Sequence, residues 1–310
     1  MFDRFLVPTD FSAPSEAALG YARTLAGTFG GALHVLHVLD SEFLRVALGD
    51  PHDQETAALR QLHDRLTDDD RRRFRAFAIV ERSDEPADAI ASYARTHDID
   101  VIVMGTHGRT GMKHLLAGSV AEKVVRTAPC PVLTLRDTAS GQGGARPARI
   151  LVPTDYSAPS DAALACARRL AAQFGSSLHI LHVLEEVAAS SAFGSEFYMG
   201  DSPDVRAARL KDAQERLAHR VIPGGQSQVH TTAEVVSGRS AQAIVDSAAN
   251  GNFDLIVMGT HGRSGVAHLL MGSVAETVVR TASCPVLTVR EIRERAPEPV
   301  KDGKPINATA

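Results

Sequence analysis

The chain has 310 residues, of which 44% are hydrophobic and 23% are charged, as is typical of a globular protein of about two domains. A net charge of −4, with no long basic run apart from Arg71–Arg73, argues against nucleic acid as the main partner. No apolar run approaches the roughly 20 residues that span a bilayer, and the three cysteines are too few for a disulfide framework, so we expect a cytoplasmic protein without a membrane anchor.

Strand and helix signals alternate along the first half of the chain. Ser12 or Ser15 can cap a first helix, and the acidic and basic run at residues 68–73 is predicted to be a solvated turn. This alternation predicts a parallel sheet with helices on both faces. The predicted strands cover residues 5–8, 33–39, 74–80, 101–104 and 131–135, and the later helices cover 54–66, 86–97 and 119–127.

A long internal repeat divides the chain into two similar halves. Residues 5–40 and 150–185 share 24 of 36 positions, and residues 104–122 and 258–276 share 15 of 19. A repeat of this length predicts two duplicated domains rather than a solenoid. The predicted parts are a first domain at 1–136, a linker rich in Gly, Ala and Ser at 137–148, a second domain at 149–290 with a nine-residue insertion near 190–203, and a disordered tail at 291–310.

The most informative motif is a glycine-rich loop between the fourth strand and the fourth helix of each half. Glycines allow close approach to the backbone, and a helix start offers unpaired N–H groups with a partial positive charge. Together with Arg109, Gly105, Gly108 and Gly118 could therefore cradle a phosphate. A structural alternative stays open: Ser119 and its repeat Ser273 fit the capping box S-x-x-E, which would explain the serine without a ligand.

These motifs resemble the universal stress protein family. The resemblance rests on G-x2-G-x9-G-S after a strand, V-P-T-D at the end of the first strand and C-P-V-L-T in the last strand, in both halves. It implies an α/β fold with two repeated open parallel five-stranded sheets, each ordered 3-2-1-4-5 with helices on both faces. It also implies that the two domains pack as a pseudo-dimer through their fifth strands, and a homodimer is a further possibility.

The family resemblance further implies that each half binds ATP. The first strand's end and the backbone after the second strand would meet adenine and ribose, and the glycine loop would hold the phosphates, at the point where the strand order reverses. The implied first-half residues are Pro8, Thr9, Asp10, Val38, Met104, Gly105, Gly108, Arg109, Gly118, Ser119 and Val120. The implied second-half residues are Pro153, Thr154, Asp155, Val183, Met258, Gly259, Gly262, Arg263, Gly272, Ser273 and Val274.

We expect ATP, with Mg²⁺ as its counter-ion where one is needed, to set a conformation in stress adaptation with slow or no hydrolysis, because the sequence has no signature of a catalytic base. Two alternatives stay open: an interaction module with vestigial sites, or a slow ATPase. No metal site is expected at the repeated histidines, because residues three apart on a strand point to opposite faces. The sequence S-D-E-P at 83–86 replaces S-G-R-S at 237–240, so we predict tighter binding in the second half.

Overall fold

The structure is a computed structural model that describes residues 2–39, 51–106, 118–136, 146–185, 203–221, 229–261 and 271–290. Its first half contains β1 (Arg4–Pro8), α1 (Ala13–Phe29), β2 (Ala32–Leu39), α3 (Pro51–Arg65), α4 (Asp68–Phe74), β3 (Phe77–Arg82), α5 (Pro86–Thr96), β4 (Val101–Gly105), α6 (Ser119–Thr127) and β5 (Val132–Leu135). Its second half contains β6 (Arg149–Pro153), α7 (Ala158–Phe174), β7 (Ser177–Leu184), α8 (Pro203–Val221), β8 (Thr231–Ser237), α9 (Ser240–Asn250), β9 (Leu255–Gly259), α10 (Ser273–Thr281) and β10 (Val286–Val289). None of the helices in these ranges is long and apolar enough to cross a bilayer.

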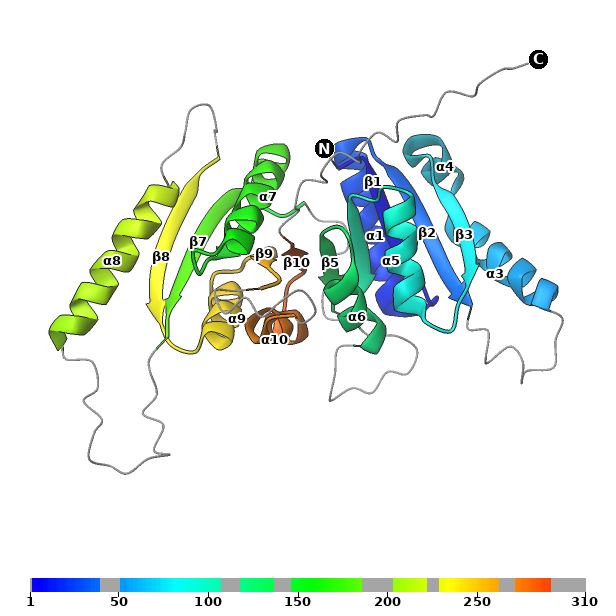
Figure 1. Cartoon of the computed structure of the whole chain (residues 1–310). Helices are drawn as coiled ribbons and strands as arrows, with labels where there is room; N and C mark the ends of the chain where they lie inside the picture. The colour runs from blue at the N-terminus through cyan, green and yellow to red at the C-terminus, as the bar shows by residue number, and fades with distance from the viewer. Residues whose placement is uncertain are drawn as a thin grey trace, which may run out of the picture.

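The strands form a single ten-stranded sheet in the order β3-β2-β1-β4-β5-β10-β9-β6-β7-β8. The predicted order 3-2-1-4-5 and the parallel pairing within each half are confirmed. The expectation of two separate sheets is wrong, because β5 and β10 pair antiparallel at the centre of the molecule (Figure 1). Both strands are fully apolar or buried along their length, and an exposed edge of this kind would otherwise invite uncontrolled strand pairing.

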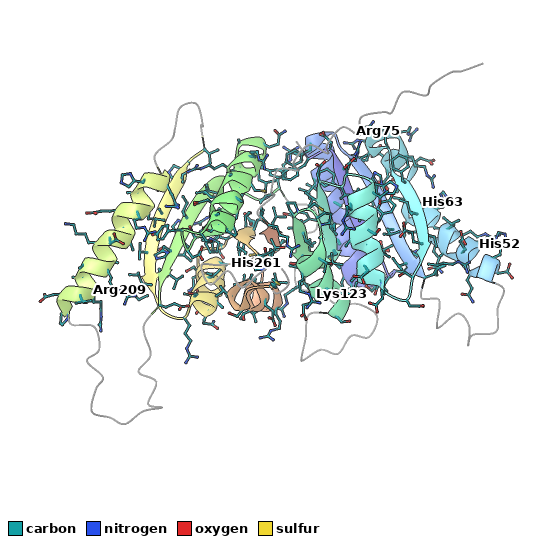
Figure 2. All side chains as sticks on the ribbon, viewed as in Figure 1. His52, His63, Arg75, Lys123, Arg209 and His261 are labelled. Carbon is teal, nitrogen blue, oxygen red and sulfur yellow. The ribbon has the colours of Figure 1, made fainter. Side chains whose placement is uncertain are left out.

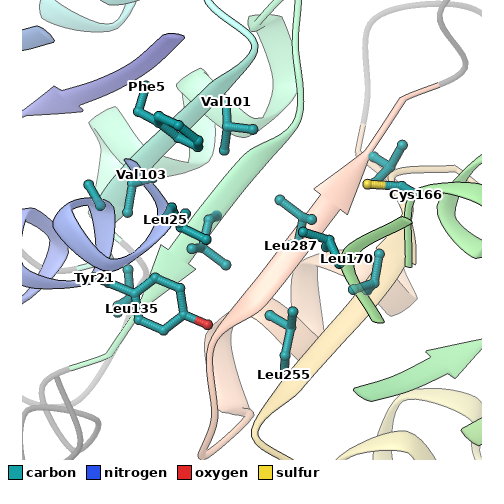
Figure 3. Close-up of a cluster of buried hydrophobic side chains, with 14 of the residues drawn as sticks. Phe5, Tyr21, Leu25, Val101, Val103, Leu135, Cys166, Leu170, Leu255 and Leu287 are labelled. Atoms are coloured by element: carbon teal, nitrogen blue, oxygen red, sulfur yellow. The ribbon is translucent and has the colours of Figure 1, made fainter. Parts of the chain in front are cut away.

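Helices cover both faces of the sheet, but the two faces are organised differently. On one face, α1 and α7 share a core that runs across both halves, with Leu25, Leu170 and Leu287 among its buried members (Figure 3). The rings of Phe29 and Phe174 meet edge to face in this core, with centroids 5.7 Å apart. On the other face, α5 with α6 and α9 with α10 each cover their own apolar cluster, so that face keeps two separate cores.

Helix α1 begins directly after the first strand, which places its first turn at the carboxyl edge of the sheet. Ser12 is the N-cap residue, whereas Ser15 lies inside the first turn and is buried. The helix ends at Gly30, whose φ of 68° is the left-handed conformation that favours glycine at this position. The equivalent α7 begins after Ser157, whose side chain accepts from the amide of Ser160, and ends at Gly175 with a φ of 73°.

The structure corrects the prediction for residues 68–80. The charged run is not a solvated turn but the short helix α4, and β3 begins only at Phe77. Thr67 and Asp70 form a capping box at its start, acidic residues fill its first turn and arginines its last, as the helix dipole favours. Asp70 is buried and binds Arg23 of α1 through two hydrogen bonds of 2.8 Å, a contact between residues 47 positions apart.

Several predicted segments lie outside the described residues. These are most of the linker, the insertion before α8 and the tail, which fall at 137–145, 186–202 and 291–310. The predicted domain boundaries themselves stay predictions.

Candidate functional site

Each half has a cleft at the carboxyl ends of its strands. The cleft lies between the first and fourth strands of that half, where the order of the strands in the sheet reverses. The first cleft has a volume of about 250 Å³ and the second of about 510 Å³. In the first half, the described residues predicted to bind a ligand all line this cleft: Pro8, Thr9, Asp10, Val38, Met104, Gly105, Gly118, Ser119 and Val120. In the second half, they are Pro153, Thr154, Asp155, Val183, Met258, Gly259, Gly272, Ser273 and Val274. The remaining four, Gly108, Arg109, Gly262 and Arg263, lie outside the described residues.

The start of α6 forms one wall of the first cleft. Gly118 is the N-cap residue, and Ser119 is the first residue of the helix. The expected capping box at Ser119 and Glu122 is therefore wrong, because the amide of Glu122 donates to the carbonyl of Gly118 at 3.1 Å and the serine sits one position too late to cap. Gly118 has no side chain with which to cap the helix, so within the part of the chain that the structure describes no side-chain cap occupies the first-turn amides.

The second cleft repeats this arrangement at the start of α10. Gly272 is the N-cap residue and has no side chain to cap the helix, and the capping box considered at Ser273 is wrong for the same reason. The amide of each N-cap glycine donates a hydrogen bond to the residue that follows the fourth strand of its half. Gly118 donates to the carbonyl of Thr106 at 2.6 Å, and Gly272 donates to that of Thr260 at 2.9 Å. Each half thus has a helix start that a backbone hydrogen bond fixes in place and that no described side chain caps.

An acidic side chain lines each cleft together with the helix start. Asp10 follows β1, and its Oδ1 accepts hydrogen bonds from the amide and the hydroxyl of Ser12, at 3.1 and 2.5 Å. The next residue, Phe11, has a φ of 66°, an uncommon conformation for a residue with a side chain. Non-glycine residues in this conformation cluster at functional sites, where the surrounding structure maintains the strain. The carboxylate therefore has a defined direction at the rim of the cleft.

The second half reproduces this corner with the same geometry. Asp155 accepts from the amide and hydroxyl of Ser157 at 3.1 and 2.5 Å, and Tyr156 has a φ of 67°. The aromatic ring is held by cations in both halves. Arg65 lies 4.6 Å from the ring centroid of Phe11, and Arg216 lies 4.3 Å from that of Tyr156.

A buried polar network supports the acidic corner from inside the protein. The hydroxyl of Thr9 lies 3.0 Å from that of Ser15, and the carbonyl of Thr9 lies 2.7 Å from Nδ1 of His37. Thr9 therefore both makes local hydrogen bonds and lines the cleft. Sequence reasoning did not identify Ser15 and His37 as cleft residues, although both are repeated, as Ser160 and His182, and repetition of buried polar residues was the available signal.

The repeated histidines separate as predicted. His37 contacts Thr9 and the ring of Phe11, whereas Nδ1 of His34 lies 2.8 Å from the hydroxyl of Tyr93 on α5, which covers the opposite face. In the second half, His261 lines the cleft, and its Nδ1 also lies 2.9 Å from the hydroxyl of Thr260. Within the described ranges, no three His, Cys, Asp or Glu side chains are grouped closely enough to hold a metal ion.

The two clefts differ at the starts of α5 and α9, which line the first and the second cleft respectively. In the second, Ser240 lines the cleft and donates to the carboxylate of Glu185 at 2.6 Å. Arg209 also lines this cleft, and Figure 2 shows its place on α8. In the first, Pro86 takes the place of Ser240 and offers no hydroxyl. Glu85, just outside that cleft, is bound by Lys123 at 2.7 Å. The second cleft is therefore larger and more polar at this end.

Comparisons with known proteins agree with the repeat. Residues 1–136 and 148–290 both match the sequence model of the universal stress protein family. A universal stress protein of Mycobacterium bovis is 30% identical over 199 residues, which span 63% of this chain and 63% of that relative, less than two thirds of its length. One from Mycobacterium tuberculosis is 32% identical over 209 residues, or 66% of this chain and 67% of the relative. The crystal structure of a universal stress protein from Archaeoglobus fulgidus has the same fold, with a TM-score of 0.68 at 23% identity, covering 94% of this chain and 99% of that one.

Proposed function

Because the family model matches both halves, this chain belongs to the universal stress protein family, and we propose that each half binds one ATP molecule in its cleft. The nucleotide acts as a conformational ligand in stress adaptation in the cytoplasm, with slow or no hydrolysis. The observation that carries this proposal is that each cleft is lined by a helix start whose N-cap residue is glycine and by a carboxylate that its hydrogen bonds hold in place.

The helix start is the phosphate end of the proposed site. Unpaired amides of a first helical turn and the positive end of the helix dipole favour an anion. Val120 and Ser119 lie in this turn and line the cleft, and the hydroxyl of Ser119 is not used in capping. It is therefore positioned to donate to a phosphate oxygen. Ser273 and Val274 have the same roles in the second half.

The nucleoside end lies on the far side of the cleft, over the ends of the first two strands. Pro8, Val38 and Ile90 provide apolar surface there, which suits a flat base. The ionised carboxylate of Asp10 only accepts hydrogen bonds, so its natural partners are ribose hydroxyls or the amino group of adenine. A nucleotide satisfies both ends of this cleft, whereas a free phosphate would use only the helix start.

The described residues of the cleft offer little for hydrolysis. Phosphoryl transfer to water needs a group that orients the water and accepts its proton. Asp10 already accepts two hydrogen bonds at Oδ1 from Ser12 and lies at the proposed nucleoside end, away from the helix start. Mg²⁺ would accompany ATP as the counter-ion of its phosphates. ATP then favours whichever conformation of the protein binds it more tightly.

The test combines native mass spectrometry of the purified chain with calorimetric titration of ATP. We expect retained nucleotide or measurable binding of up to two equivalents, and loss of most binding in the double variant Asp10→Ala/Asp155→Ala. Asp64→Ala is the matched control, because Asp64 is an exposed acid on α3 that does not line the cleft. Absence of nucleotide and of any binding heat would favour an interaction module with vestigial sites. Release of phosphate well above that of buffer would favour a slow ATPase.

A further inference from the structure

The two helices that start at the clefts end against the opposite half of the molecule. Nη1 of Arg290 donates to the carbonyl of Ala128, the C-cap residue of α6, at 3.4 Å. Reciprocally, Nη1 of Arg136 donates to the carbonyl of Ala282, the C-cap residue of α10, at 3.4 Å. Each arginine directly follows the last strand of its own half. A cation at a helix C-terminus is favourable for the helix dipole, and here the other half supplies it.

Backbone hydrogen bonds connect each of these arginines to the cleft of its own half. The residue before Arg290 is Val289, whose carbonyl accepts from the amide of Thr260 at 3.1 Å. The carbonyl of Thr260 in turn accepts from the amide of Gly272 at 2.9 Å, and Gly272 is the N-cap residue of α10. The end of α6 is therefore linked through Arg290 to the start of α10, which forms the second cleft.

The same connection runs in the other direction. The carbonyl of Leu135, next to Arg136, accepts from the amide of Thr106 at 2.9 Å. The carbonyl of Thr106 accepts from Gly118, the N-cap residue of α6, at 2.6 Å. The end of α10 is thus linked through Arg136 to the start of α6, and the two connections together form a closed ring through both clefts.

This ring is buried at its backbone positions. Thr106 and Thr260 are 1% and 2% exposed, and Ala128 and Ala282 are fully buried. Two side-chain hydrogen bonds also join β5 to β10. The hydroxyl of Thr134 donates to the carbonyl of Val286 at 3.2 Å, and that of Thr288 donates to the carbonyl of Val132 at 3.1 Å. Packed interiors have little free volume, so a shift of one cleft helix is passed to its bonded neighbours rather than absorbed.

We propose that the two clefts are energetically coupled through Arg136 and Arg290, so that a ligand in one cleft tightens binding in the other. This inference rests on the proposed binding of ATP in both clefts. An anion at the start of α6 orders that helix. The C-terminal end of α6 then fixes Arg290, and Arg290 is connected through the end of β10 to the start of α10. The second ligand meets a cleft that is already ordered and loses less conformational entropy on binding.

The experiment uses the full chain and two single-cleft variants, Ser119→Asp and Ser273→Asp. An acidic residue in the first turn suits a helix, so these chains are expected to fold, but its charge repels phosphate from that cleft alone. ATP is titrated by calorimetry into each chain. We expect the intact chain to bind its second ATP about fivefold more tightly than the single-cleft variants predict, at the low end of typical coupling. The double change Arg136→Gln/Arg290→Gln should remove this excess and leave the single-cleft affinities unchanged.

A second measurement keeps the arginines in place, in case their replacement prevents folding. In the Ser273→Asp chain, only the first cleft can take ATP, and hydrogen exchange of the α10 amides should slow when it does. The coupling is rejected if the intact chain behaves as the sum of the two single-cleft variants, if the excess survives the arginine changes, or if exchange in α10 does not respond. Failure of the intact chain to bind any ATP would instead refute the proposed function.

Discussion

A Cβ atom at Gly105 would lie 2.7 Å from the Cβ of Pro14, so the end of β4 meets the first turn of α1 with no room for a side chain. Gly259 has the same relationship with Pro159 in the second half, where the Cβ atoms would be 3.0 Å apart. The first glycine of each motif is therefore required by the packing of the cleft floor, whether or not a ligand also approaches it.

Gly105→Ala is expected to destabilise the protein by about 1–3 kcal/mol, because overpacking shifts the backbone of the neighbouring helix. Urea unfolding measures this change in the free energy of unfolding. Gly20→Ala is the matched control, since a Cβ there meets nothing within 4 Å and lies in the middle of α1. It should stabilise the protein by about 0.5–1 kcal/mol. Equal effects of the two changes would show that the contact with Pro14 is not tight.

The buried pair of Arg23 and Asp70 should contribute measurably to stability. Burial opposes ionisation of Asp70, but hydrogen bonds from Arg23 and Thr67 outweigh it and hold the pKa of this carboxyl below its usual range. Asp70→Asn should cost about 1–3 kcal/mol, because it weakens charge-assisted hydrogen bonds of a buried group. Asp69→Asn is the control, since its ion pair with Arg73 is exposed and should contribute less than about 0.5 kcal/mol.

The same pair predicts the direction of the pH dependence. Asp70 has a lower pKa in the folded state, so its contribution is fully present above the unfolded value of about 3.9 and is lost as the pH falls through the folded pKa. Unfolding curves recorded between pH 5 and 2 should therefore converge for the native chain and Asp70→Asn. A gap between them that stays constant with pH would contradict this account.

His34 predicts a second pH dependence of stability, because the folded state favours its neutral form. Burial lowers the pKa of His34 to about 4, with His97 and Arg4 adding to the effect. The unfolded state, with a pKa of about 6.5, binds a proton first, so stability should fall as the pH drops from that value towards 4. We expect His34→Gln to reduce this loss by on the order of 1 kcal/mol, a value already discounted for solvent screening. Thermal unfolding at pH 7.5 and 5 tests it, and an unchanged difference would exclude His34 as the cause.

Lys123 is expected to support the first cleft through its charge. It lies 2.7 Å from Glu85 and 3.0 Å from Asp88, and so offsets acidic residues that the second half lacks. Lys123→Thr, which copies Thr277 of the second half, should weaken ATP binding to the first cleft by about two- to fivefold at low salt, and less as salt screens the charge. Calorimetry in the Ser273→Asp chain isolates this cleft. An affinity that does not change at any salt concentration would remove the charge argument. It would also weaken the prediction that the second cleft binds more tightly.

Much of the fold was predictable because its signals are local. Apolar periodicity, the repeat and the strand–helix alternation fixed nearly all elements of the first half to within a few residues, including α6 at Ser119–Thr127. The region around α4 was missed because its charged sequence resembles a solvated turn. One face of this segment is buried through the contact of Asp70 with Arg23, which is distant in sequence, and through Phe74, which joins the core.

The sequence by itself determined the two repeated units and the alternation of strands and helices within them, because glycine spacing and hydrophobic period are properties of neighbouring residues. The strand order and most of the residues that line each cleft came from the resemblance to the universal stress protein family. The tertiary structure decided that β5 and β10 join the halves into one sheet, and that Gly118 rather than Ser119 is the N-cap residue of α6. The physical reason is that the unpaired backbone groups of strand edges and helix ends, like buried charged side chains, bond to the partners that the folded chain brings close to them. Those partners come from positions that no local pattern connects.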